Sequence, residues 1–181
     1  FRNRKAFFGK SRCLRNDRSF AILTFRFEHS RVIASFSPMQ IAFTKMNGAG
    51  NDFILIDNRD QAIELSTKQI ERLCDRHRGI GADGLLLLEP NTSGSADWTW
   101  RFYNSDGGSA DMCGNGARCF GAFVRKLTKK DTSITFETLA GIIDASFDDS
   151  LVTVTLPPPG PMEVDQAIEV NGSQITSHSL N

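Results

Sequence analysis

The sequence predicts an α+β fold built mostly from antiparallel strands, and three features support this. Segments 133–137, 142–147 and 151–156 alternate apolar and polar residues and are separated by turn residues, as in a β-meander. Residues 85–88 are four consecutive leucines, which is typical of a strand buried on both faces. Residues 117–127 follow a glycine-rich stretch and have the apolar spacing of a helix.

Length and composition are those of an ordinary globular protein. The chain has 181 residues, enough for one sizeable core, and is 40% hydrophobic and 23% charged. No run approaches the roughly 18 apolar residues of a membrane helix. The four cysteines form no CxxC pair, which argues against a zinc-ribbon site and favours reduced thiols in an intracellular protein. We expect no metal, no cofactor and no membrane partner.

The charge is unevenly distributed. Residues 1–38 hold nine Lys or Arg and two acidic residues, a net charge of +7, and the remainder carries −7. The overall neutrality therefore gives no support for a nucleic-acid partner, and we expect none.

The basic extension, residues 1–38, is expected to lie outside the domain. The first methionine is Met39, and the extension has no clean helical or strand period. It is interpreted as an organelle transit peptide, as upstream sequence translated through a misplaced start, or as a basic tail for anionic surfaces. We favour the second interpretation.

The first elements after Met39 are two short strands and a helix. Strands are predicted at 41–45 and 53–56, with a glycine-containing turn at 47–50 between them. Ser66 is predicted to be a helix N-cap, with Gln69 completing a capping box.

Residues 70–104 contain a helix face, a glycine-rich loop and a second long strand. Ile70, Leu73 and Cys74 fall at helical spacing, so Cys74 is expected to pack inward. The loop at 79–84 precedes the four leucines, and a strand at 98–103 leads to Asn104.

Proline residues mark the predicted end of the domain. The segment 157–161, PPPGP, is a stiff break. We therefore predict one unit at 39–160, and residues 161–181 as the start of a second, incomplete lobe.

The stretch 104–121, NSDGGSADMCGNGARCFG, holds the candidate chemistry. Cys113 lies at or just before the start of a helix, where free backbone N–H groups and the helix dipole favour a thiolate. Gly114 and Gly116 have no Cβ, so a ligand can approach the backbone closely. The backbone N–H groups of these glycines could bind a carboxylate, as helix N-termini often do. The alternative interpretation is a buried structural cysteine beside a glycine-rich turn.

The motif MCGNGARC resembles the first catalytic motif of the diaminopimelate epimerase family. Three further segments match in the family's order: KMNGAGNDF at 45–53, RHRGIGADGLLLLE at 76–89 and FYNSDG at 102–107. The resemblance covers the chain from Met39 onward. It implies a lobe of mostly antiparallel strands wrapped around the helix that follows Cys113, with the Ser66 helix outside.

The resemblance also implies a reaction and site residues. Members of the family are cofactor-independent isomerases that interconvert LL- and meso-diaminopimelate, in lysine and peptidoglycan precursor biosynthesis. Cys113 matches the position of a catalytic base. The substrate-binding positions of the family are matched by Asn51, Asn104, Gly114 and Asn115. Of these, Gly114 and Asn115 would bind the substrate carboxylate through their backbone N–H groups.

In the family two similar lobes each supply one cysteine, and a strand from the far C-terminus completes the first lobe. Cys119 lies about 9 Å along the same helix as Cys113, on another face, and Cys74 is expected in the core. The chain is therefore expected to carry one half-site and to be inactive by itself. It departs mildly from the family at Gly84, where many members carry glutamine, and at Asn47, where histidine is common.

Several alternatives stay open. Phenazine-biosynthesis-type isomerases and proline racemase relatives share the implied fold, but CGNGARC argues against both. A non-catalytic truncated remnant and a redox-sensing cysteine are further alternatives. The family implies a cytoplasmic location, or a plastid if the basic extension is a transit peptide. The sequence leaves open whether the chain forms a homodimer.

Overall fold

A computed structural model describes residues 21–24, 40–149, 151–158 and 161–180. Cys13 and most of the basic extension lie outside these residues. The described elements are β1 (Ala21–Thr24), β2 (Gln40–Gly48), β3 (Asn51–Asp57), α1 (Thr67–Cys74), β4 (Gly84–Pro90), β5 (Trp98–Asn104), α2 (Gly114–Thr128), β6 (Ser133–Thr138), β7 (Gly141–Asp148), β8 (Leu151–Thr155), β9 (Met162–Val170) and β10 (Ser173–Leu180).

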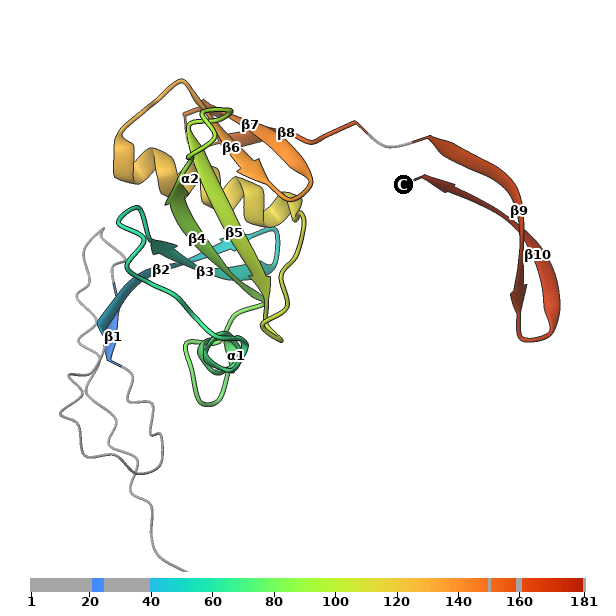
Figure 1. Ribbon diagram of the computed structural model, residues 1–181, viewed down its shortest axis with the longest axis horizontal. Helices are drawn as coiled ribbons and strands as arrows, with labels where there is room; N and C mark the ends of the chain where they lie inside the picture. The colour runs from blue at the N-terminus through green and yellow to red at the C-terminus, as the bar shows by residue number, and fades with distance from the viewer. Residues whose placement is uncertain (1–20, 25–39, 150, 159–160, 181) are drawn as a thin grey trace, which may run out of the picture.

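Strands β1 to β8 form one curled sheet in sequence order (Figure 1). The β3–β4 and β5–β6 pairs are parallel, and the other five pairs are antiparallel. Helix α2 lies against the concave side of the sheet and α1 lies on the opposite side (Figure 1). The α+β class, the wrapped helix and the outer position of the Ser66 helix are thus confirmed.

The four leucines of β4 show why the sheet has a core on each face. Leu86 and Leu88 belong to the apolar cluster around α2, and Leu85 and Leu87 belong to the cluster around α1. All four are at most 1% exposed. Successive side chains of a strand point to opposite faces, so an uninterrupted apolar run is what a strand between two layers requires.

The N-terminal hairpin differs slightly from the prediction. The turn was predicted at 47–50, but β2 continues to Gly48 and β3 begins at Asn51, so Ala49 and Gly50 alone form the loop. Both have positive φ, 53° and 99°, as the two central residues of a type I′ turn do. This turn matches the twist of the two strands, and it makes Asn51 the first residue of β3.

Helix α1 begins as the sequence predicted. Ser66 is the N-cap, and its backbone N–H donates to Oε1 of Gln69 at 2.8 Å. Cys74 is 3% exposed, which confirms its inward packing.

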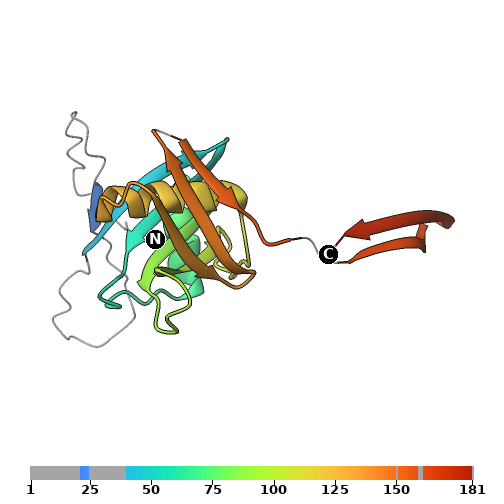
Figure 2. The ribbon, with the colours of Figure 1, turned by 90° about the horizontal axis from the view of Figure 1, so that it is seen from above.

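Two described segments lie outside the unit predicted at 39–160: part of the basic extension, which was expected to lie outside the domain, and residues 161–180, which were expected to begin a second lobe. Ala21–Thr24, within the basic extension, pairs with β2 and adds an edge strand to the sheet. Strands β9 and β10 form a hairpin that extends away from the curled sheet (Figure 2). Apolar side chains on this hairpin are exposed, namely Met162, Val164, Ile168, Val170 and Ile175.

Gly48 sets how closely α2 approaches the N-terminal hairpin. A methyl group at Gly48 would lie 2.7 Å from the backbone oxygen of Asn115 and 2.9 Å from Sγ of Cys119. Both separations are too short for carbon, so the strand and the start of α2 are in contact only because residue 48 lacks a side chain.

We predict that Gly48→Ala lowers the free energy of unfolding by about 1–3 kcal/mol, the usual cost of forcing extra volume into a packed site. Urea unfolding followed by circular dichroism measures it. Gly108→Ala is the control, because its methyl group would meet only the terminal oxygen of Asp106, at 3.1 Å, and that side chain can move. Equal stability of the two variants would contradict the close approach.

Candidate active site

Cys113 occupies the position that the sequence predicted, at the N-cap of α2. Its backbone is extended, with φ −148° and ψ 114°, and its carbonyl accepts the N–H of Ala117 at 2.8 Å. Its Sγ accepts the backbone N–H of Gly116 at 3.5 Å. Cys113 is a partly exposed residue that packs against the edge of the apolar cluster around α2, so it lies at the boundary between core and surface.

The start of α2 also presents N–H groups that the helix does not use. Gly114 and Asn115 are the first two helical residues, and a helix supplies no acceptor for its first N–H groups. Together with the helix dipole they make a site for an anion, such as a carboxylate. The thiol and this anion site are therefore adjacent along the chain.

Asn51 joins the same site from the sheet. Asn115 Nδ2 donates to Asn51 Oδ1 at 2.6 Å, although the two residues are 64 positions apart. On the other side, Asn115 Oδ1 accepts from the guanidinium of Arg118. The structure thus brings together Cys113, Gly114, Asn115 and Asn51.

Asn104 lies at the same end of the sheet but is not linked to the others. It is the last residue of β5 and pairs in register with Gly84, the first residue of β4. Its backbone N–H donates to the carbonyl of Gly108 at 2.9 Å, and its carbonyl accepts from Gly107 at 2.9 Å. Within the described residues its side chain contacts none of the other candidate residues through a hydrogen bond. A role in substrate binding stays a prediction.

The two departures from the family pattern have local structural roles. Asn47 Oδ1 accepts the N–H of Gly50 at 3.1 Å and so braces the hairpin turn. A side chain at Gly84 would begin 2.7 Å from the ring of Phe102 and 2.8 Å from the carbonyl oxygen of Tyr103. The ring of Phe102 therefore takes space that a glutamine at position 84 would need.

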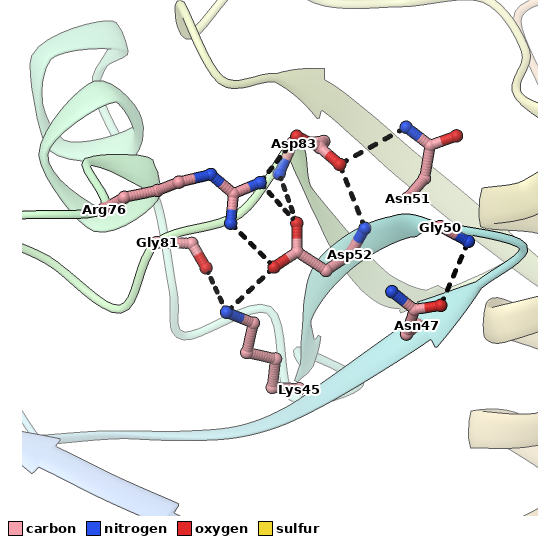
Figure 3. Close-up of polar contacts among 8 residues, drawn as sticks. All are labelled: Lys45, Asn47, Gly50, Asn51, Asp52, Arg76, Gly81 and Asp83. Atoms are coloured by element: carbon pink, nitrogen blue, oxygen red, sulfur yellow. Dashed lines mark hydrogen bonds and ion pairs between the residues drawn. The ribbon is translucent and has the colours of Figure 1, made fainter.

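Sequence reasoning missed a cluster of four charged residues beside Asn51: Lys45, Asp52, Arg76 and Asp83 (Figure 3). Arg76 binds both oxygens of Asp52, at 2.7 and 3.0 Å, and Oδ1 of Asp83 at 2.7 Å. Lys45 Nζ lies 2.9 Å from Asp52 and 2.5 Å from the carbonyl oxygen of Gly81. All four residues lie within the motifs that resemble the family, and the presence of charged residues there could have indicated this cluster.

This cluster perturbs one titratable group strongly. The hydrogen bonds from Arg76 hold the pKa of Asp52 well below its usual range, against an opposing effect of burial, and Lys45 acts in the same direction as Arg76. The side chain of Asp52 is 15% exposed. The carboxylate is therefore ionised at neutral pH, and it ties β2 and β3 to the loop that precedes β4.

The other two described cysteines are chemically distinct from Cys113. Cys74 and Cys119 are 3% and 4% exposed. Burial raises the pKa of each thiol to about 11. They are poor nucleophiles and poor bases at neutral pH, since only the thiolate reacts.

The part of the chain that the structure describes carries neither a membrane-spanning helix nor a cluster of metal-binding side chains. No helix there is long and apolar enough to span a membrane. No group of three or more His, Cys, Asp and Glu side chains there has the geometry to hold a metal ion.

A family model for diaminopimelate epimerase matches residues 43–157, more than half of the chain. The chain belongs to the diaminopimelate epimerase family. Among curated relatives, the diaminopimelate epimerase of Aromatoleum aromaticum is 49% identical over 121 residues, which cover 65% of this chain and 43% of that protein. That of Variovorax paradoxus is 48% identical over 127 residues, covering 67% and 43%. The chain thus spans less than half the length of these relatives.

Solved structures support the fold assignment. A hydroxyproline epimerase from Agrobacterium vitis superposes with a TM-score of 0.57 at 16% identity, covering 76% of this chain and 48% of that one. A probable proline racemase from Agrobacterium radiobacter gives 0.57 at 18% identity, covering 77% and 48%. At these identities the likeness shows the fold alone.

We predict that Asp52→Asn lowers the free energy of unfolding by about 1–2 kcal/mol at pH 7, because a charge-assisted network is lost but partly screened by water. The folded-state pKa of Asp52 lies below the value of about 3.9 expected in the unfolded chain. Its stabilisation is therefore complete above about pH 4 and is lost as the pH falls further, toward the folded-state pKa.

Urea unfolding of both proteins at pH 7, 4 and 3 measures this difference. Asp148→Asn is the control, since Asp148 is exposed and forms no ion pair with another described residue. A difference between wild type and Asp52→Asn that does not shrink below pH 4 would refute the linkage.

Proposed function

We propose that this chain provides one half of a diaminopimelate epimerase active site, in which Cys113 exchanges the proton of a substrate Cα. The supporting observation is the placement of a partly exposed cysteine at the N-cap of α2, with its Sγ 3.5 Å from the backbone nitrogen of Gly116 and next to unused helix N–H groups. A base and an anion site side by side are what removal of a proton next to a carboxylate requires.

In the proposed reaction the Cys113 thiolate takes the Cα proton and becomes a thiol. The electron pair of the broken C–H bond moves into the carboxylate, whose developing charge faces the N–H groups of Gly114 and Asn115. A second acid on the opposite face of the carbon returns a proton and inverts the centre. No oxidant or cofactor is consumed.

The second acid–base group is proposed to come from outside the described residues. Cys74 and Cys119 are buried, so neither can face Cys113 across one carbon atom. Cavities of about 470 and 290 Å³ flank α2, and neither is lined by Cys113. We therefore propose that the opposing wall of the half-site comes from a second lobe, which the hairpin β9–β10 begins. The predicted location, cytoplasm or plastid, and a homodimer stay predictions.

We predict that a chimera joining residues 39–160 to the remaining part of the Aromatoleum aromaticum relative epimerises LL-diaminopimelate in D₂O with deuterium incorporation at Cα. Cys113→Ala in the chimera removes a general acid–base group, so we expect turnover to fall by about 100-fold to 10 000-fold. Cys74→Ala is the control and affects mainly stability. Undiminished turnover of Cys113→Ala would overturn the assignment, and epimerisation by chain 1–181 alone would overturn the half-site.

We also predict that iodoacetamide at pH 7 modifies Cys113 faster than Cys74 or Cys119, because the latter are buried with a pKa of about 11. Peptide mapping by mass spectrometry separates the sites, and Cys13 lies outside the described residues. In 8 M urea the three rates should converge. Slower labelling of Cys113 than of Cys119 in the folded protein would contradict the proposed thiolate.

A further inference from the structure

A chain of side-chain hydrogen bonds crosses the site from helix α2 to the loop before β4. The Arg118 guanidinium donates to Asn115 Oδ1, and Asn115 Nδ2 donates to Asn51 Oδ1 at 2.6 Å. Asn51 Nδ2 then donates to Asp83 Oδ2 at 3.3 Å. Three segments far apart in the sequence are thereby joined through the two asparagines of the candidate site.

The two ends of this chain fix the direction of every bond in it. A guanidinium only donates hydrogen bonds, and an ionised carboxylate only accepts them, whereas an amide has one end of each kind. Facing Arg118, Asn115 must present its oxygen, which turns its NH₂ group toward Asn51. Facing Asp83, Asn51 must present its NH₂ group, which turns its oxygen toward Asn115. Both ends therefore require the same orientation of both amides.

Asp83 is itself held in place from several sides. Its Oδ1 accepts from Arg76 at 2.7 Å, and its Oδ2 accepts the backbone N–H of Asp52 at 3.1 Å (Figure 3). Its own N–H donates to the carbonyl oxygen of Asp52 at 2.9 Å. The carboxylate is 40% exposed, so it is positioned by these partners and not by burial.

We propose that Asp83 is a positioning residue, which orients the amides of Asn51 and Asn115 so that the site presents N–H donors to a substrate carboxylate. Each NH₂ group uses one hydrogen in the chain and keeps a second. If both amides were reversed, their carbonyl oxygens would lie where the NH₂ groups now lie, and these oxygens would repel an anion. The substrate part of this inference rests on the proposed function, whereas the orientation of the amides does not.

The test compares Asp83→Asn with Asp97→Asn in the 1–181 chain. Asp97 is a close match for Asp83: its side chain is 37% exposed, it pairs with Lys130 at 3.1 Å, and it accepts the backbone N–H of Thr135 at 2.9 Å. Both variants lose an ion pair and weaken a backbone hydrogen bond. Only Asp83→Asn also replaces the acceptor-only group at the end of the series of hydrogen bonds through Asn51 and Asn115. Asp83→Glu tests whether a carboxylate alone restores the effect.

The first measurement is the side-chain amide signals of Asn51 and Asn115 in ¹H–¹⁵N NMR spectra, assigned by their loss in Asn51→Ser and Asn115→Ser. We expect Asp83→Asn to shift both pairs of signals and to accelerate their hydrogen exchange at least about tenfold, with Asp97→Asn unchanged. Unchanged signals in Asp83→Asn would overturn the proposal.

The second measurement is the Kd of LL-diaminopimelate for the chimera described above, in its Cys113→Ala form so that binding is measured without turnover, carrying the same substitutions. We expect Asp83→Asn to raise Kd at least about tenfold, Asp83→Glu to recover part of the loss, and Asp97→Asn to stay within about twofold. Shifted amide signals with a wild-type Kd would overturn the role in carboxylate recognition. If the chimera without a substitution at Asp83 or Asp97 does not bind diaminopimelate, the proposed function fails, and the amide signals of the 1–181 chain still decide the orientation.

Discussion

The close contact between helix α2 and the N-terminal hairpin is the constraint on which the site depends. At Gly48 the strand touches the backbone of Asn115 and the sulfur of Cys119 without space for a methyl group. This contact sets the distance between the start of the helix and the start of β3, where Asn51 lies. The hydrogen bond from the side-chain amide of Asn115 to that of Asn51 can form only at that distance, and the N-cap residue Cys113 is positioned with it.

The core behind this contact is held rigid by closely packed aromatic side chains. Phe53 and Phe120 are fully buried, and Phe120 packs at 4.8 Å from the ring of Phe136 and 5.8 Å from that of Trp100. Close packing of large rings leaves the helix little freedom to slide along the sheet. Because the helix cannot slide, its N-cap residue, Cys113, has a fixed position. The proposed role of Cys113 requires this, since its sulfur would have to meet one particular hydrogen of the substrate.

The sequence predicted the local features and missed those that depend on distant segments. The helix start at Ser66, the burial of Cys74 and the N-cap position of Cys113 follow from spacing and capping chemistry within a few residues. The cluster around Asp52 joins residues 7 to 31 positions apart, and no local pattern marks such partners. The parallel pairing of β3 with β4 and the pairing of Ala21–Thr24 with β2 were not predicted, for the same reason. The β9–β10 hairpin is different, because its two-residue turn, Asn171-Gly172, is a local signal that sequence reasoning overlooked.

The proposed chemistry places two negative charges at one helix start, a thiolate and a substrate carboxylate. Two unit charges about 4 Å apart repel by roughly 4 kcal/mol at an effective dielectric constant of about 20. The helix divides its donors between them, with Gly116 N–H directed to Sγ and those of Gly114 and Asn115 left for the carboxylate. Arg118 adds a positive charge through Asn115, whereas the cluster of Lys45, Arg76, Asp52 and Asp83 has no net charge. The cluster therefore adds no net charge near the site, and the effect that we propose for it on carboxylate binding comes through the orientation of the amides.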